Sequence, residues 1–317
     1  NLSAAKKGLS LWANSVVPSL LPFFIATELL GYTNIISILG KMLNKLMKPV
    51  FNVPGEGAFP FIMGIISGYP VGAKIVADFK KQGLCSDIEA ERLIAFTNNS
   101  GPLFIIGTVG IGLFKDTKTG ILLLITHIFA CITVGILFRW WKNSKNKRST
   151  SFIETSNKLP SRISLSNLGE VLASSIMNSI STIFLIGGFV VLFSVVISIL
   201  NSSGCLELIS SFLSPIFKTF GIPSKYIKGI VIGLIELTNG VCSIALIASK
   251  NISTNVIICA FLLGFGGISV ALQVLSITSK NGISIKPYLL GKFLQGCFAA
   301  LYTYLILNNF CFLNLDL

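Results

Sequence analysis

The stretch Gly64-Ile65-Ile66-Ser67-Gly68-Tyr69-Pro70-Val71-Gly72 lies inside an otherwise apolar run from Ala58 to Phe79. A membrane-spanning helix satisfies its backbone polar groups internally, and glycine and proline weaken or break such a helix. Gly68, Pro70 and Gly72 therefore predict a helix that is interrupted at membrane depth. Because broken backbone at that depth needs a lining of protein or water, the stretch marks a candidate binding site.

The composition indicates a polytopic membrane protein. Of 317 residues, 52% are hydrophobic and only 12% are charged, whereas soluble domains carry about a quarter charged residues. The net charge of +13 comes from 25 Lys and Arg against 12 Asp and Glu, and the basic residues lie mostly between apolar runs. That pattern is typical of cytoplasmic loops and lipid headgroup contacts. We therefore expect the lipid bilayer as a partner and, in the absence of a basic–aromatic patch, reject a nucleic-acid role.

Cysteine spacing and motifs argue against a metal site or an enzyme. The seven cysteines are scattered and show no C-x-x-C spacing, so we expect free thiols, no metal and no cofactor. The motifs G-x-x-x-x-G-K-[ST], H-E-x-x-H and G-x-S-x-G are absent from the sequence. ATP-driven transport by this chain alone and common hydrolytic chemistry are therefore unsupported.

The first half of the chain, residues 1–141, is interpreted as one membrane repeat. Its elements are a first span kinked by two prolines (9–30), an amphipathic helix on the membrane surface (35–47), two interrupted segments (58–79 and 93–114) and a complete span (119–141). The second interruption is Thr97-Asn98-Asn99-Ser100-Gly101-Pro102, again at mid-depth. Glu28 lies near the end of the first span, where an interfacial carboxylate is the favoured interpretation.

A basic, hydrophilic stretch separates the halves. We predict a flexible linker over 142–169, which the positive-inside rule makes cytoplasmic. A second repeat then covers 170–317 with a long apolar run (171–200), an amphipathic stretch (206–220), two interrupted segments (227–248 and 257–277) and a last span (287–307). Its breaks are Glu236-Leu237-Thr238-Asn239-Gly240 and Gly264-Phe265-Gly266-Gly267.

The shared order of elements is stronger evidence for a repeat than any single residue match. Gly64-Ile65-Ile66 aligns with Gly233-Leu234-Ile235, which places Ser67 opposite Glu236. Paired Gly/Pro interruptions in corresponding positions point to a transporter binding site, because half-helix ends and freed backbone groups converge there. Coincidental glycines at helix contacts are the alternative. The pattern leaves open whether a broken segment crosses the membrane or turns back as a hairpin, and it does not give the oligomeric state.

Two stretches, FPFIMGIISGYPVGAKIVADF (59–79) and LIAFTNNSGPLFIIGTVG (93–110), resemble the sporulation integral membrane protein family of endospore-forming bacteria. The resemblance runs through nearly the whole chain, although GLIELTNG in the second half is more degenerate. That family carries the Gate, or nucleoside-recognition, repeat, shared with concentrative nucleoside transporters and the membrane part of ferrous-iron transporters. The resemblance implies a role in spore formation, with transport of dipicolinic acid from the mother cell towards the forespore across the outer forespore membrane. Fold similarity does not transfer the nucleoside substrate, because function resides in the site.

Lys74 is the most informative single charge. It follows the first break by about one helical turn within an apolar segment, where a charge needs protein, water or a ligand. A dicarboxylate substrate supplies a counter-charge; the alternative is snorkelling to the interface with Asp78 as ion-pair partner. The substrate-binding candidates that we expect to face the centre are Ser67, Tyr69, Lys74, Asn98, Asn99, Ser100, Thr238, Asn239 and Gln273.

Three further interpretations concern polar groups at or near the breaks. Glu236 is a candidate for coupling to a proton or cation; the alternative is a neutral or ion-paired structural acid, with Lys74 as partner. Asn98, Asn99 and Ser100 can bind carboxylate oxygens or cap their own broken helix. His127 is interpreted as a hydrogen-bonded helix contact rather than a ligand. The helix-breaking residues are Gly68, Pro70, Gly72, Gly101, Pro102, Gly240, Gly266 and Gly267.

Together these patterns predict an all-α polytopic membrane protein with two pseudo-symmetric repeats that contribute interrupted helices to a central cavity. The predicted function is movement of a small anionic metabolite, passively or coupled to a proton or cation. A non-transporting membrane scaffold for the spore envelope is the main alternative. A nucleoside-like or ion transporter is another.

Overall fold

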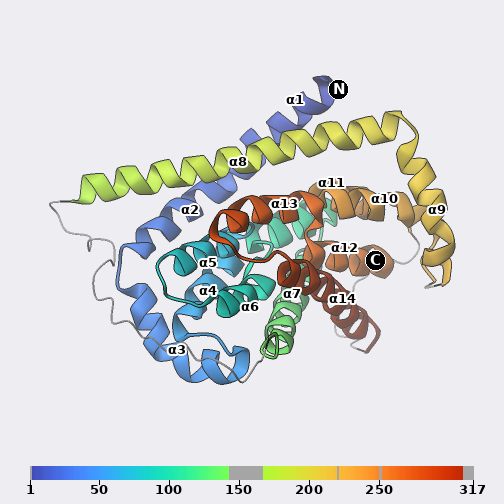
Figure 1. The fold of residues 1–317 in the computed structure, drawn as a ribbon. Helices are drawn as coiled ribbons and strands as arrows, with labels where there is room; N and C mark the ends of the chain where they lie inside the picture. The colour runs from blue at the N-terminus through green and yellow to red at the C-terminus, as the bar shows by residue number, and fades with distance from the viewer. Residues whose placement is uncertain (1, 143–166, 220, 250–251, 310–317) are drawn as a thin grey trace.

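The computed structural model describes residues 2–142, 167–219, 221–249 and 252–309. Every regular element in these ranges is helical, which confirms the all-α prediction (Figure 1). Within the described ranges, four helices are long and apolar enough to cross a membrane, or up to six if each bent helix pair counts as one span. Most of the predicted linker, residues 143–166, and Cys311 lie outside the described residues.

Two long helical rods lie antiparallel across the molecule (Figure 1). The first consists of α1 (Leu2–Leu11), the π-helical turn η1 (Trp12–Val16) and α2 (Val17–Gly31), and the second is α8 (Leu168–Ser202). The Trp12 indole donates a hydrogen bond to the carbonyl of Ile183, 3.0 Å away. Pro18 has no N–H and lies two residues after the π-turn, which agrees with the predicted irregularity of this span.

An amphipathic helix follows each rod, as predicted. These helices are α3 (Ile35–Phe51) and α9 (Cys205–Thr219). The direction of α3 turns by 83° from that of α2. Several of the apolar side chains on these helices point outward, Met42 on α3 and Phe212 on α9 among them. Outward apolar side chains beside lysines are typical of helices that lie in a membrane interface.

Two of the predicted breaks are tight turns between antiparallel helices. The first hairpin consists of α4 (Ala58–Ser67) and α5 (Val71–Lys81), and the second of α10 (Ser224–Ile235) and α11 (Leu237–Ala245). In each hairpin the two helices pack on each other. The structure therefore answers the question that the sequence left open: these two segments turn back instead of continuing.

The remaining segments of each half are a broken helix and a complete one. The broken segments are α6 (Asp87–Thr97) followed by the π-helix η3 (Leu103–Leu113), and α12 (Ser253–Phe265) followed by α13 (Gly267–Thr278). The complete helices are α7 (Thr117–Phe138) and α14 (Lys286–Asn309), and two single 3₁₀ turns cover Gly55–Gly57 and Ser279–Asn281. Element order is thus the same in both halves; a pseudo-symmetry axis relating them remains a prediction.

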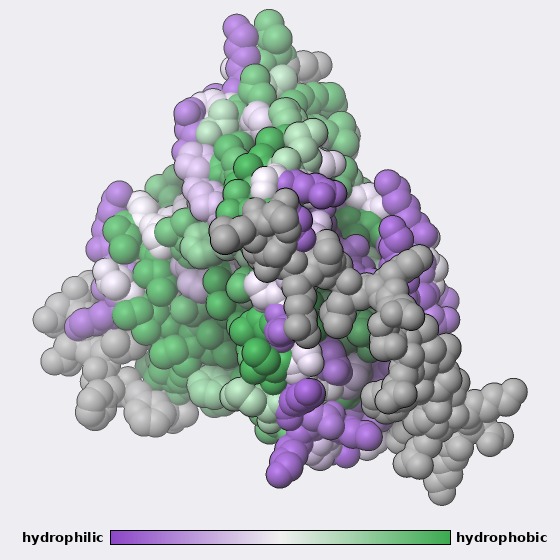
Figure 2. Space-filling model, turned by 90° about the vertical axis from the view of Figure 1, so that its left-hand side faces the viewer, coloured by the Kyte–Doolittle hydropathy of each residue, from purple (hydrophilic) through white to green (hydrophobic). Residues whose placement is uncertain are grey.

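The outer surface is strongly apolar. Figure 2 shows hydrophobic side chains over much of one face, with hydrophilic residues towards its edges. Exposed large apolar residues occur along α8 and α14, for example Phe184, Leu192 and Phe293. Lipid is the solvent that such a surface requires, so the chain is an integral membrane protein.

Candidate functional site

The first hairpin approaches α6 very closely. A Cβ added to Gly64 or to Gly72 would overlap the carbonyl oxygen of Thr97, the last residue of α6. Only glycine lets the hairpin backbone pass this near to another helix. At the tip, Gly68 has a φ of +82°, and a Cβ there would meet the backbone N of Gly101 at 3.0 Å. The first break therefore lies directly against the second.

The same tip also contacts the second half of the chain. The Tyr69 hydroxyl donates a hydrogen bond to the carbonyl of Leu263 at 3.1 Å. A Cβ on Gly266, whose φ is +84°, would meet that hydroxyl at 3.0 Å. The break between α12 and α13 is thus built around a side chain from the first hairpin.

The second hairpin completes the arrangement. Its helices cross where a Cβ on Gly240 would overlap the backbone of Gly233. A Cβ on Gly267 would in turn meet the carbonyl oxygen of Gly233 at 3.0 Å. The four breaks that were read from separate stretches of sequence therefore meet in one region.

Glu236 holds the tip of the second hairpin. Its carboxylate accepts hydrogen bonds from the backbone amides of Thr238 (3.0 Å) and Asn239 (2.8 Å), so it caps the start of α11. The Asn239 side-chain amide donates to the same carboxylate at 2.8 Å. Negative charge at this position also interacts favourably with the positive end of the helix dipole.

The polar residues of the second break face inward and are almost fully buried. Asn99 donates to the carbonyl of Phe96 at 2.9 Å, and the backbone amide of Ser100 donates to Nε2 of His127 at 3.3 Å. These bonds satisfy backbone groups that the break exposes, which is the capping role that the sequence offered as an alternative. The side-chain Oδ1 of Asn98 is buried and accepts no hydrogen bond within the described part of the chain.

Two residues of α14 that the sequence reasoning missed bind this break. Lys292 is 1% exposed, and its ammonium donates to the carbonyl of Asn98 at 3.0 Å and to Oε1 of Gln295 at 2.8 Å. The Gln295 amide donates to Oδ1 of Asn99 at 2.8 Å. A signal was present, because a lysine seven residues into an apolar span is costly unless it has partners inside the protein.

Lys74 lies apart from this centre. It forms an ion pair with Glu28 on α2 and donates to Oγ1 of Thr182 on α8 at 3.1 Å. The expectation that Asp78 or Glu236 pairs with Lys74 is therefore wrong, because neither i,i+4 spacing nor repeat alignment reveals that α2 packs against the first hairpin. Ser67 also faces α2, where its hydroxyl lies 3.1 Å from that of Thr27.

The two remaining candidates lie in the second half. Thr238 is half-buried at the start of α11, and Gln273 is buried on α13. Neither residue lines the pocket beside the tip of the second hairpin. No group of three or more His, Cys, Asp or Glu side chains is arranged to hold a metal ion in the ranges that the structure describes.

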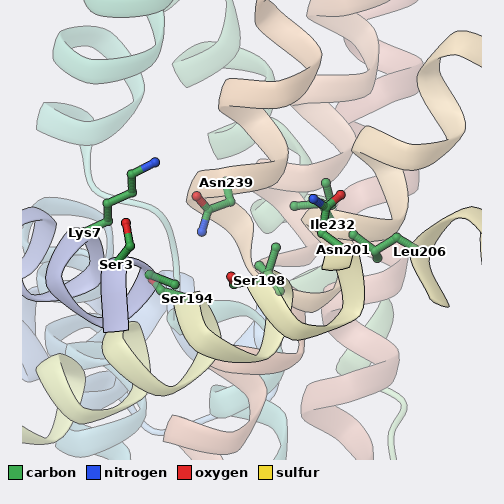
Figure 3. Close-up of a pocket in the computed structure, with 10 residues that line it drawn as sticks. Ser3, Lys7, Ser194, Ser198, Asn201, Leu206, Ile232 and Asn239 are labelled. Atoms are coloured by element: carbon green, nitrogen blue, oxygen red, sulfur yellow. The ribbon is translucent and has the colours of Figure 1, made fainter. Parts of the chain in front are cut away.

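A pocket of about 280 Å³ opens beside the tip of the second hairpin (Figure 3). It lies where α1 and α8 pass α10 and α11, and Asn239 projects towards it from α11. Lys7 is the only charged residue among the described residues that line it. Lys7, Ser198 and Asn201 form no side-chain hydrogen bond or ion pair with any described residue, so they are available to a ligand. The lining residues are Ser3, Ala4, Lys7, Ser194, Ile197, Ser198, Asn201, Leu206, Ile232 and Asn239.

Comparisons with known proteins agree with this architecture. The nucleoside-recognition (Gate) family model matches residues 13–139 and 183–281, more than half of the chain. Sporulation integral membrane protein YlbJ of Bacillus subtilis (strain 168) is 36% identical over 318 residues, which cover 96% of this chain and 77% of that protein.

A solved structure shares the fold at low sequence identity. The structure of CNTnw N149S, E332A in an outward-facing state superposes with a TM-score of 0.61 at 14% identity, over 93% of this chain and 76% of that one. This match bears on the fold alone. From the family model and the Bacillus subtilis relative, the chain belongs to the nucleoside-recognition (Gate) family and to the family of sporulation integral membrane protein YlbJ.

Proposed function

We propose that this chain is a carrier that moves a small anionic metabolite across a membrane during sporulation. The substrate that we assign is dipicolinate, moved from the mother cell towards the forespore across the outer forespore membrane. The observation that carries the proposal is the pocket beside the second hairpin, with Lys7 and uncommitted hydrogen-bond donors on its wall. The name of the Bacillus subtilis relative supports the link to sporulation.

The pocket chemistry suits a flat dicarboxylate. Lys7 supplies positive charge, while Ser198, Asn201 and Asn239 supply hydroxyl and amide donors for carboxylate oxygens. Ile197 and Ile232 offer apolar surface for an aromatic ring. None of the described residues that line the pocket is acidic, so none of them repels an anion.

Release of the anion is assigned to movement of the second hairpin. Asn239 belongs both to the pocket wall and to the hydrogen-bond set of Glu236. Protonation of Glu236 would turn one carboxylate acceptor of the α11 cap into a hydroxyl donor and weaken the hydrogen bonds that hold Asn239. In this scheme, binding of a proton by Glu236 is coupled to alternating access. The hairpins then move relative to the rods α1–α2 and α8.

The test is uptake by vesicles that contain only this protein. Purified protein is reconstituted into liposomes, and entry of radiolabelled dipicolinate or, in parallel, of radiolabelled uridine is measured with and without a pH gradient. Protein-free liposomes are the blank, and unlabelled isophthalate and uridine are the competitors. We expect uptake that exceeds the blank, saturates and is inhibited by isophthalate more than by uridine.

A matched pair of variants tests the pocket itself. Lys7→Gln removes the only charge on the wall, whereas Lys6→Gln neutralises its exposed neighbour, which does not line the pocket. Loss of one charge-assisted hydrogen bond of about 1.5–3 kcal/mol corresponds to roughly 10- to 100-fold weaker binding. We expect this weaker binding of dipicolinate for Lys7→Gln and not for Lys6→Gln.

Absence of dipicolinate uptake under any gradient would favour a scaffold, and uptake of uridine alone would favour a nucleoside carrier. Either result overturns the proposal.

A further inference from the structure

Lys292 is a buried cation without a buried anion. Its side chain is 1% exposed, and no carboxylate forms an ion pair with it among the residues that the structure describes. An isolated charge in a low-dielectric interior is strongly unfavourable unless dipoles take the place of water. Hydrogen-bond acceptors and an aromatic ring are the groups around Lys292 that can stabilise its positive charge.

Two oxygen acceptors and one aromatic ring surround the Lys292 ammonium, and we call this set of groups the cradle. The ammonium donates to the carbonyl oxygen of Asn98 at 3.0 Å and to Oε1 of Gln295 at 2.8 Å. It also lies 4.9 Å from the centroid of the Tyr69 ring, a distance at which the ring quadrupole attracts a cation. This set joins the first hairpin, the break after α6 and the helix α14 through one charged group.

The cradle has the composition of a monovalent-cation site. Asn98 is the first residue after α6, so its carbonyl is one of the groups that a helix break frees. Unwound carbonyls of broken transporter helices are the groups that coordinate Na⁺. An alkali ion would thus find carbonyl and amide oxygens in place if the ammonium were absent.

We propose that the ammonium of Lys292 is a built-in cation that occupies this cradle. The protein accordingly holds its broken helices together without a bound alkali-metal ion. Removing the ammonium converts the cradle into a Na⁺ site. Lys292 is therefore a positioning residue, since it acts through Asn98, Tyr69 and Gln295. This inference does not depend on the transported substrate.

Thermal unfolding of the purified full chain, measured in NaCl and in choline chloride at equal ionic strength, tests the proposal. The wild-type midpoint is expected to be the same in both salts. Lys292→Met should unfold several degrees lower in choline chloride and recover in NaCl with a saturable dependence on Na⁺. Lys286→Met, which removes an exposed lysine from the same helix, should show neither effect.

Two further variants, Lys292→Gln and Lys292→Met combined with Gln295→Leu, test the same cation site. If Lys292→Met does not fold, Lys292→Gln replaces it, because the amide retains a hydrogen-bond donor without the charge. Adding Gln295→Leu should weaken the recovery by Na⁺, since one oxygen of the cradle is lost. A saturable rise of the wild-type midpoint with Na⁺ would overturn the proposal. So would a Lys292 variant whose midpoint is identical in Na⁺ and choline.

Discussion

At the scale of single residues, polar side chains near the breaks divide into structural and uncommitted groups. Asn99, Glu236 and Lys74 have protein partners that account for their polarity. Lys7 and Ser198 have none among the described residues, and both line the pocket. Residues with free hydrogen-bonding capacity are therefore better substrate-binding candidates than residues that are merely polar and deep.

The Lys74–Glu28 pair gives a prediction at this scale. Lys74→Met leaves the Glu28 carboxylate, 20% exposed, with Asn178 as its remaining side-chain partner at 3.2 Å. Because both side chains keep some access to solvent, we expect a coupling energy of only about 1 kcal/mol. A double-mutant cycle with Lys74→Met and Glu28→Gln, measured by thermal unfolding, gives that value. If Lys74 instead bound substrate, Lys74→Met would abolish uptake while leaving the unfolding midpoint unchanged.

At the scale of elements, glycines decide how the hairpins fit. Gly64 and Gly72 bring the first hairpin against the end of α6, and Gly233 and Gly240 form the crossing within the second hairpin. In each case the neighbour is backbone, which cannot move aside as a flexible side chain does. The hairpins are therefore held by close backbone packing, a common device where no water is available to drive association.

Alanine at two of these glycines should be strongly destabilising. We expect Gly64→Ala and Gly240→Ala each to cost about 3 kcal/mol, the upper end of the usual range for overpacked cores, because the added methyl overlaps backbone atoms. Gly188→Ala on α8 is the matched control, since nothing lies within 4 Å of its added methyl. That control should stabilise by about 0.5–1 kcal/mol through helix propensity. Equal midpoints for all three variants would contradict the packing account.

The start of α7 supplies a pH-dependent prediction. Asp116 accepts hydrogen bonds from Thr119 N (2.7 Å), Thr119 Oγ1 (2.6 Å) and Lys118 N (3.1 Å). Desolvation acts to raise the pKa of Asp116, but these hydrogen bonds outweigh it and hold the pKa below its ordinary value. Because the folded pKa is depressed, the stabilisation is present above the unfolded pKa and is lost as pH falls through the folded pKa.

Comparison with Asp116→Asn isolates this effect. The amide oxygen retains a capping acceptor but does not titrate. We expect the wild type to be the more stable protein at pH 7 and the difference to shrink as the pH falls below about 4. Thermal unfolding at several pH values measures it. A difference that stays constant with pH would show that the carboxylate charge contributes nothing to this cap.

At the scale of the whole molecule, the two rods α1–α2 and α8 extend over both hairpins (Figure 1). Each hairpin contacts a different part of the rods: the first through Lys74 and Ser67, the second through the pocket wall. Transport by alternating access requires a hairpin to move relative to the rods. That requirement can be tested without knowing the path of the substrate.

A disulfide between α2 and the first hairpin should arrest transport. The hydroxyls of Thr27 and Ser67 lie 3.1 Å apart, so Thr27→Cys and Ser67→Cys place two thiols side by side for oxidative cross-linking. We expect oxidation to abolish dipicolinate uptake in the double variant and a reductant to restore it. Each single variant should be insensitive to oxidation. Full uptake by a verified cross-linked protein would exclude movement of this hairpin from the transport cycle.

The fold was largely predictable because it depends on local chemistry. Apolar length predicted the spans, and glycine, proline and polar residues in apolar runs predicted the breaks. The candidate site was less predictable. Lys292 and Lys7 gained their importance from partners or neighbours that are distant in sequence: Asn98 for Lys292 and Asn239 for Lys7.

The sequence by itself determined that this is an all-α membrane protein with paired interruptions, because the cost of exposing backbone in lipid acts on each segment separately. Tertiary structure decided which interruptions are hairpins, and it paired Lys74 with Glu28 and placed Lys292 against the second break. The physical reason is that hydrogen bonds and close packing act only over a few ångströms. The order of segments along the chain does not fix which of them become neighbours at that distance.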